Sequence, residues 1–204
     1  MSTAQQRTSS PGGPTWEIAT LFPNQGAWSV GDYLSLNTNR LVEFSDGRLE
    51  VLPMPTEEHQ LIVALLYEVL KRFVSPRKLG TALFAPLRVR LSEDKFREPD
   101  IVFMRAEHAD RRSQKFWRGA DLVMEVVSED DPDRDLVAKR VEYARAGIGE
   151  YWIVDPRDRT VTVLVLDASS DVYRQAGWYA MGETAKSEQL DGLTADVTEV
   201  FSQR

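Results

Sequence analysis

The sequence predicts an α/β domain in which two long helices alternate with the strands of a mixed β-sheet. Apolar residues recur at helical spacing over residues 57–74 and again over about 133–146, and short apolar runs typical of strands surround both segments. The last three runs follow one another without a helix, which indicates an antiparallel meander. Because no repeat and no boundary follows residue 28, we expect one domain over residues 16–204, behind a flexible Ser-, Pro- and Gly-containing tail at 1–15.

Caps and turn residues set the boundaries of the elements in the first part of the chain. Ser29 is placed to cap a short helix, and Asp46-Gly47 supplies the turn of a hairpin over residues 41–52. Two prolines end the hairpin. Thr56 then caps the first long helix, which begins with two glutamates, as the helix dipole favours.

The other strand candidates come in two groups, one between the long helices and one after the second of them. That second helix is expected to end at Gly147. A basic, polar connection at 105–119 interrupts the first group, and the closing segment 189–200 has no clear type. The candidate strands are residues 82–91, 100–104, 121–127, 150–154, 160–166 and 172–178.

The composition excludes several kinds of chemistry. With 25 Lys and Arg against 32 Asp and Glu, the formal net charge is −7, which argues against a surface that is basic throughout but allows a local basic strip. The chain has no cysteine, which excludes disulfides, thiolate nucleophiles and zinc–thiolate sites. With only two histidines, His59 and His108, a bound metal would have mainly oxygen ligands, which favours Mg²⁺, Mn²⁺ or Ca²⁺.

Other signals are missing from the sequence. No glycine-rich phosphate loop or dinucleotide-binding fingerprint occurs. No segment reaches the roughly 20 apolar residues of a membrane helix, and the first residues lack the apolar core of a signal peptide. We therefore expect a cytoplasmic protein without a membrane partner.

Three acidic residues occupy unusual positions. Glu125 lies inside the apolar run 122–127, where burial is costly unless the carboxylate is paired or binds a cation. Asp100 follows Pro99 at the start of an apolar strand, and Glu43 lies in the first hairpin. Each also has an ordinary explanation. Strand alternation could turn Glu125 to solvent, Asp100 could simply begin its strand, and Glu43 could face solvent.

The helix after Glu125 offers two basic residues for a site. Lys139 borders the apolar stripe that contains Leu136 and Tyr143, whereas Arg140 lies nearer to its middle. An ordinary explanation of Lys139 is a surface ion pair with Asp135, four residues earlier, which would contribute little to stability. Helical spacing does not choose between the two cations.

The order of these features is an acid, a Pro-Asp pair, an acid within a strand and a lysine in the next helix. It resembles the Uma-two family of restriction endonucleases, which belongs to the PD-(D/E)XK nuclease superfamily. The resemblance covers about residues 28–166 and implies a restriction-endonuclease-like core, with a mixed β-sheet flanked by α-helices, an N-terminal β-hairpin and a C-terminal antiparallel meander. The segments that carry it are Glu43–Gly47, Pro55–Gln60, Glu98–Asp100, Asp121–Ser128, Lys139–Tyr143 and Gly147–Pro156.

The resemblance further implies a metal-dependent endonuclease that hydrolyses phosphodiester bonds in nucleic acid, with DNA as the expected substrate and Mg²⁺ or Mn²⁺ as the cofactor. The superfamily's usual lysine, two residues after the second acid, is replaced here by Val127, and Lys139 matches a lysine relocated to the next helix. The implied catalytic residues are Glu43, Asp100, Glu125 and Lys139, and the implied metal ligands are Asp100, Glu125 and the carbonyl of Val126.

Two further residues match the family without an assigned role. His59 matches a recurring histidine, and packing on the core at the start of a helix would also explain it. Tyr143, one helical turn after Lys139, is the second.

An acidic protein needs local basic residues to bind nucleic acid. The connection 105–118 is rich in them and includes Phe116 and Trp117, which could stack on bases. A solvated polar loop is an equally good explanation. The candidate nucleic-acid-binding residues are Arg88, Arg90, Arg111, Arg112 and Lys115.

Two other functions are consistent with the residues. The chain could be a catalytically silent nucleic-acid-binding or regulatory module that retains the nuclease fold, or a hydrolase that uses paired carboxylates on another substrate. A homodimer is also expected, because large apolar residues follow position 150 and could form a contact between copies. They are Tyr151, Trp152, Ile153, Trp178 and Tyr179.

Overall fold

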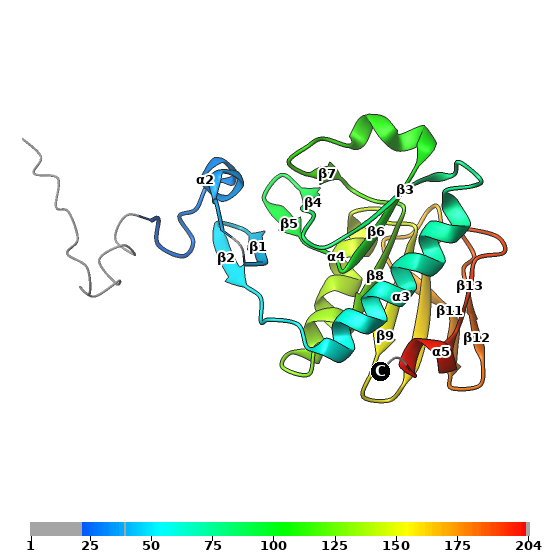
Figure 1. Cartoon of the computed structure of the whole chain (residues 1–204). Helices are drawn as coiled ribbons and strands as arrows, with labels where there is room; N and C mark the ends of the chain where they lie inside the picture. Colours follow the sequence, from blue (N-terminus) through cyan, green and yellow to red (C-terminus); the bar gives the residue numbers. More distant parts are fainter. Residues whose placement is uncertain (1–21, 39, 203–204) are drawn as a thin grey trace, which may run out of the picture.

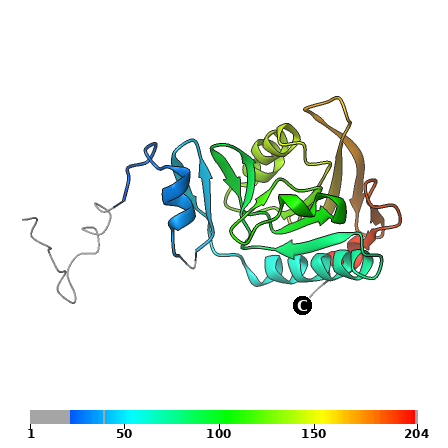
Figure 2. The same cartoon turned by 90° about the horizontal axis from the view of Figure 1, so that it is seen from above.

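Two helices lie on opposite faces of a six-stranded mixed sheet in the computed structural model, which describes residues 22–38 and 40–202. Figure 2 shows α3 (Glu57–Val74) along one face and α4 (Lys139–Arg145) on the other. The expected tail at 1–15 lies outside the described residues. The strand order is β11-β10-β9-β8-β6-β3. The bounds are β3 Gly80–Phe84, β6 Ile101–Arg105, β8 Leu122–Val126, β9 Glu150–Asp155, β10 Thr160–Leu166 and β11 Tyr173–Ala180.

The mixed α/β class and the C-terminal meander are confirmed. Strands β9, β10 and β11 pair antiparallel in succession, while β8 and β9 run parallel and are joined through α4. The helix predicted over 57–74 has those same bounds, and the Thr56 side chain accepts a hydrogen bond from the His59 N–H as its cap.

Alternate residues of the central strands belong to two separate hydrophobic layers. In β6, Ile101 and Phe103 pack on the α3 side, whereas Val102 and Met104 pack on the α4 side. In β8, Met124 belongs to the α3 side and Val123 to the α4 side. Because helices cover both faces, these strands have no solvent-facing side, and their sequences read as continuous apolar runs.

A second sheet carries the N-terminal hairpin, in the order β2-β1-β5-β4-β7. Figure 1 shows this hairpin and α2 (Val30–Ser35) beside the main sheet. The predicted cap and hairpin are confirmed: Ser29 and Asp32 form a capping box, and the turn residues Asp46 and Gly47 both have positive φ. The bounds are β1 Val42–Ser45, β2 Arg48–Val51, β4 Val89–Ser92, β5 Lys95–Arg97 and β7 Trp117–Arg118.

Gly47 is required at its position for two reasons. Its φ is 76°, which a side chain disfavours. A Cβ there would also lie 2.7 Å from the carbonyl oxygen of Gly26. The turn therefore fixes the hairpin against the segment that leads into α2.

Three expectations about secondary structure are wrong in part. The strand predicted at 82–91 is two strands, β3 and β4, which belong to different sheets. Pro86 lies between them and has no N–H to continue a ladder. The connection at 105–119 is partly ordered as a 3₁₀ helix, η1 (Ala106–Arg111), followed by β7. The second long helix begins with a π-helical turn, η2 (Arg134–Ala138), before α4.

The C-terminal segment closes the α3 side of the main sheet. Strands β12 (Thr184–Lys186) and β13 (Thr194–Asp196) pair, and α5 (Val197–Phe201) buries Val197 and Val200 in the same layer as α3. No helix in the described part of the chain combines the length and hydrophobicity that a membrane span requires.

The apolar residues expected at a dimer contact divide into two groups. Tyr151, Trp152 and Ile153 are buried within the core of the chain itself, so they cannot meet a second copy. Trp178 on β11 is 55% exposed. The homodimer stays a prediction.

Candidate active site

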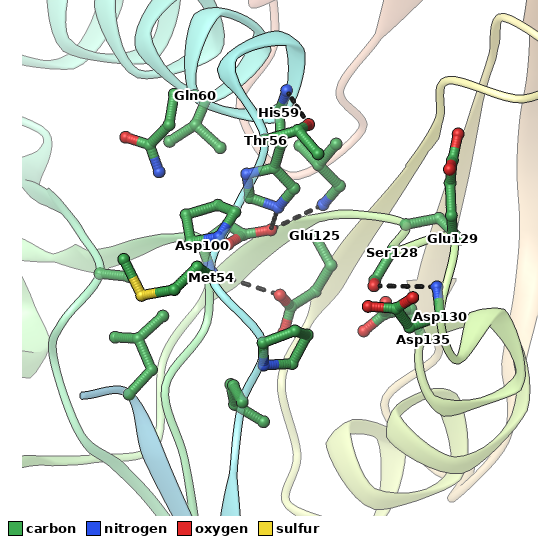
Figure 3. A pocket seen from close by; sticks show the side chains of 18 of the residues that line it. Met54, Thr56, His59, Gln60, Asp100, Glu125, Ser128, Glu129, Asp130 and Asp135 are labelled. Carbon is green, nitrogen blue, oxygen red and sulfur yellow. Dashed lines mark hydrogen bonds and ion pairs between the residues drawn. The ribbon is translucent and has the colours of Figure 1, made fainter.

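A cavity of about 620 Å³ opens where the segment before α3, the start of α3 and the connection after β8 come together. Figure 3 shows Asp100 and Glu125 in this cavity, with Met54 and Gln60 on one side and Ser128, Glu129 and Asp130 on the other. The sequence brings these segments together because β6 and β8 pair directly, with Ile101 opposite Met124. Asp100 directly precedes Ile101 and Glu125 directly follows Met124, so the two acids lie close together.

Backbone hydrogen bonds hold the two acids together. The N–H of Asp100 donates to Oε2 of Glu125 at 3.2 Å, and the N–H of Val126 donates to Oδ2 of Asp100 at 2.8 Å. The Glu125 side chain is 3% exposed and that of Asp100 is 16% exposed. Glu125 thus lies at the closed end of the cavity, and Asp100 lies nearer to its opening.

The solvent-facing alternative for Glu125 is wrong. Glu125 follows Val123 on the α4 side of β8, where α4 covers it. Nζ of Lys139 lies 2.8 Å from Oε1 of Glu125, and the hydroxyl of Tyr143 donates a short hydrogen bond to the same oxygen. Lys139 and Tyr143, one helical turn apart, hold the carboxylate from the same helix.

Lys139 is the buried cation of α4, at 3% side-chain exposure, and Arg140 is only half-buried. The π-helical turn explains why helical spacing did not separate them. The N–H of Lys139 donates to the carbonyl of Arg134, five residues earlier, so a wheel based on 3.6 residues per turn misplaces the residues after this turn.

Three carboxylates surround this one ammonium group, and we call the four residues the Lys139 cluster. Besides Glu125, Oδ1 of Asp135 lies 3.0 Å and Oε1 of Glu43 lies 3.8 Å from Nζ. Oδ1 of Asp135 is buried, and its close approach to Nζ lacks hydrogen-bond geometry, so it has no hydrogen-bond partner among the described residues. The surface ion pair considered for Asp135 is therefore a buried one, and Asp135 is a site residue that sequence reasoning missed.

The expectation that Glu43 faces solvent is also wrong, because the hairpin packs against β5 and turns Glu43 inward. Its side chain is fully buried, with Nη1 of Arg97 at 2.9 Å from Oε2 and the N–H of Glu98 at 3.2 Å from Oε1. Arg97 also makes two hydrogen bonds to Glu142, at 2.7 and 2.8 Å. This network joins the N-terminal hairpin to α4 behind the cavity.

His59 contacts the site. Its Nε2 lies 3.2 Å from Oδ2 of Asp100, while Nδ1 is buried without a hydrogen-bond partner among the described residues. Burial alone would lower the pKa of His59, but the hydrogen bond and charge of Asp100 raise it overall. Packing at the start of a helix is therefore an incomplete account of His59.

The electrostatics of the cavity follow from its excess of carboxylates. Burial raises the pKa of Glu125; the charge of Lys139 opposes this, and the charges of Asp100 and Asp135 add to it. Burial would lower the pKa of Lys139, but Glu125, Glu43 and the other acids raise it overall. Lys139 is therefore held as a cation, and the site carries more negative charge than this one ammonium group balances.

The donor set suits some divalent metals better than others. No group of three or more His, Cys, Asp or Glu side chains in residues 22–38 and 40–202 is arranged to hold a metal ion. This is not the pattern of an all-protein cage for Ca²⁺ or Zn²⁺. The two carboxylates that line the cavity, those of Asp100 and Glu125, are the kind of donor set that Mg²⁺ or Mn²⁺ takes, since Mg²⁺ commonly binds one or two carboxylates and fills its other positions with water and substrate phosphate.

Comparison with known proteins identifies the family of this chain and a solved structure of similar fold. The Uma2 family model, described as "Putative restriction endonuclease", matches residues 30–198. The chain belongs to the Uma2 family. The crystal structure of a "putative nuclease" from Anabaena variabilis is similar in fold, at a TM-score of 0.67 and 20% identity, over 84% of this chain and 96% of that chain. No curated protein matches the chain.

The basic residues that this Uma2 chain was expected to use on nucleic acid have different surroundings. Arg88 lies over the ring of Tyr33 at 4.5 Å and pairs with Glu98 at 3.5 Å. Arg90 donates to backbone carbonyls of its own turn, and Arg112 donates to the hydroxyl of Thr81. Exposed positions are occupied by Arg111, Arg112 and Lys115.

Of the two aromatic residues in the 105–118 connection, Trp117 is buried, which corrects the stacking expectation for that residue. Trp117 is 3% exposed and belongs to the core layer on the α4 side. Phe116 packs edge-on against Phe96, with ring centroids 5.5 Å apart. Both rings contribute to packing.

Proposed function

We propose that this Uma2 protein is an endonuclease that uses Mg²⁺ or Mn²⁺ to hydrolyse phosphodiester bonds in DNA. The observation that carries the proposal is the pairing of Asp100 and Glu125 in one cavity, with the ammonium group of Lys139 on Glu125. The family description and the nuclease described for the similar fold support the same reaction class.

Asp100, Glu125 and the Val126 carbonyl would hold the cation. When bound, a divalent cation lowers the pKa of a water molecule and neutralises charge on the phosphate. Lys139 keeps Glu125 in place and can donate a hydrogen bond to the attacking water or to the developing negative charge. Tyr143 fixes the same carboxylate, which limits its rotation.

Glu43 contributes from behind the cavity. It is bound to Arg97 at 2.9 Å and lies 3.8 Å from Nζ of Lys139. Its proposed part in catalysis is to position the lysine, since Arg97 already occupies its carboxylate and no cavity surface is formed by Glu43 in the described residues.

Cleavage of DNA in Mg²⁺ or Mn²⁺ by purified variants tests the proposal. Asp100→Asn and Glu125→Gln keep the shape of the side chains and should each abolish cleavage. Matched controls are Asp94→Asn and Glu68→Gln, which change exposed carboxylates elsewhere and should cleave like the wild type. Unchanged cleavage by both site variants would contradict the proposal.

Metal binding can be measured without any substrate. A ligand that binds the folded chain raises its thermal stability as the ligand concentration rises above Kd. Mn²⁺ should therefore raise the Tm of wild type and of Glu68→Gln, and not that of Asp100→Asn or Glu125→Gln. Equal stabilisation of all four proteins would place the ion elsewhere.

A catalytically silent nucleic-acid-binding module is the second candidate, and one observation favours it. The carboxylate of Glu125 already receives hydrogen bonds from Lys139, Tyr143 and the N–H of Asp100. A metal would have to share a group that is satisfied without it. Binding of DNA with neither cleavage nor stabilisation by Mn²⁺ would identify this function.

A further inference from the structure

Exposed apolar side chains line the cavity beside its acids. Met54 is 75% exposed and Phe84 is 51% exposed, and both border the cavity that contains Asp100 and Glu125. Figure 3 shows the Met54 side chain beside Asp100. The Phe84 ring packs against Tyr67 of α3 at 4.8 Å between centroids in an edge-to-face arrangement. An aromatic ring that is fixed by packing and half exposed can stack with a nucleobase.

Charges around the cavity are unevenly distributed. The exposed carboxylates of Glu57, Glu58, Glu129 and Asp130 line it. Arg134 also lines it, but its side chain is only 11% exposed and is paired with Glu50 at 2.7 Å. A second hollow of about 260 Å³ adjoins it, because Leu41, Pro86 and Glu98 line both. Three basic residues line that second hollow: Arg40, Arg88 and Lys115.

This uneven distribution of charge favours binding of a single strand over binding of a duplex. Duplex DNA carries two phosphate backbones, with one negative charge per roughly 1.7 Å of its axis. A duplex over the cavity would bring phosphates against the exposed carboxylates of Glu129 and Asp130. A single strand can instead follow the basic hollow into the cavity and keep its phosphates away from that rim.

We propose that the cavity takes an unpaired nucleic-acid strand, which passes Arg40 and Lys115 and lays one base against Phe84 and Met54 next to Asp100 and Glu125. This inference rests on the proposed nuclease function and adds the substrate class to it. It also introduces Arg40, Met54 and Phe84 as substrate-binding residues.

The test compares one sequence as a single strand, as a blunt duplex and as a duplex with an unpaired flap, each in Mn²⁺. Wild type should cleave the single strand and the flap at least about tenfold faster than the duplex. Phe84→Ala should lower kcat/KM on the single strand about tenfold, the order that one stacked base contributes. Phe22→Ala is the matched control, because Phe22 is 47% exposed and stacks on Trp28, and it should cleave like the wild type.

Binding separates stacking from chemistry. In the Asp100→Asn background, a fluorescent base analogue in the single strand should change its emission on binding, and adding Phe84→Ala should remove that change. Arg40→Gln combined with Lys115→Gln should flatten the salt dependence of binding, whereas the exposed Arg145→Gln should not.

The outcomes separate the two proposals. Equal cleavage of duplex and single strand, or unchanged single-strand cleavage by Phe84→Ala, would overturn the unpaired-strand inference and leave the nuclease proposal standing. An absence of cleavage on every substrate, in Mg²⁺ and in Mn²⁺, would overturn both.

Discussion

The two faces of the six-stranded sheet are built from alternate residues of the same strands, yet they differ in chemistry. The α3 face is mainly hydrocarbon, including Leu66 of the helix and Met124 of β8. The buried carboxylate of Glu150 also lies there, and it accepts hydrogen bonds from the Trp152 indole and from two backbone N–H groups. The α4 face combines apolar packing with the Lys139 cluster, whose four charged side chains are buried. A chain that needed only stability would fill both faces with apolar residues, since buried ion pairs are often no more stabilising than hydrocarbon of the same volume. The concentration of buried, mutually paired charges on the α4 face therefore supports the function proposed for this site.

Removal of the central cation should have the largest effect on stability. Lys139→Met leaves Glu43, Glu125 and Asp135 buried without their shared ammonium group, which should lower the free energy of unfolding by about 3–5 kcal/mol. Urea denaturation measures this loss. The double variant Lys139→Met/Glu125→Leu should recover part of this loss, because it also removes one of the buried carboxylates that Lys139→Met leaves without the ammonium group. A single variant as stable as the wild type would show that the cluster does not need its cation.

Removing an apolar side chain from the α3 face should also lower the free energy of unfolding, but without affecting metal binding. Leu66 is 1% exposed, and Leu66→Ala should lower the free energy of unfolding by about 3 kcal/mol through lost contacts and an unfilled space. Below its melting temperature the variant should still bind Mn²⁺ like the wild type. Loss of metal binding at full folding would mean that the two faces are not independent.

The Arg97–Glu142 network predicts a pH dependence. Burial would raise the pKa of Glu142, but the hydrogen bonds and charges of Arg97 and Lys95 lower it overall from its ordinary value of 4.5. A lowered pKa in the folded state contributes stability above the unfolded-state pKa, and that contribution is lost as the pH falls through the folded-state pKa. Urea midpoints of the wild type should therefore fall below about pH 4.5, and Glu142→Gln should show a shallower fall. Identical acid profiles would contradict this.

An exposed ion pair should matter least. Glu68 and Arg72 are 2.6 Å apart on α3, but their side chains are 57% and 80% exposed. Glu68→Gln should change the free energy of unfolding by less than about 0.5 kcal/mol, as measured by the same denaturation. A larger loss would weaken the contrast between buried and exposed charges on which the comparison of the two faces rests.

Apolar spacing, caps and turn residues correctly predicted the elements that depend on interactions between residues close in the sequence. The helix at 57–74 follows from its apolar spacing and from Thr56, and the hairpin follows from Asp46-Gly47, because caps and turns act over a few residues. The single strand predicted at 82–91 is wrong because two sheets share one nearly continuous apolar run, which Pro86 divides.

Only part of the candidate site could be predicted from the sequence. Asp100, Glu125 and Lys139 lie together as the resemblance implied, and their apolar surroundings gave an independent reason to consider Glu125. The burial of Glu43 could not be predicted, because it depends on a contact between two sheets. Asp135 was overlooked because a pair four residues apart reads as a surface ion pair unless the helix is known to be covered. Of the apolar residues of the cavity, Met54 lies in a segment without any periodic signal, and Phe84 belongs to the apolar run predicted as a strand, where nothing in the sequence marks it as a cavity residue.

The link between Glu43 and Lys139 also bears on the order in which the chain folds. Glu43 belongs to the first hairpin, whereas Lys139 opens a helix that follows the parallel strand of the other sheet. Contacts between such distant segments form slowly, because the loop between them must close first. The Lys139 cluster needs residues from both sheets, so we expect it to be incomplete in a partly synthesised or partly folded chain. The proposed activity would then appear only after this contact between the two sheets has formed.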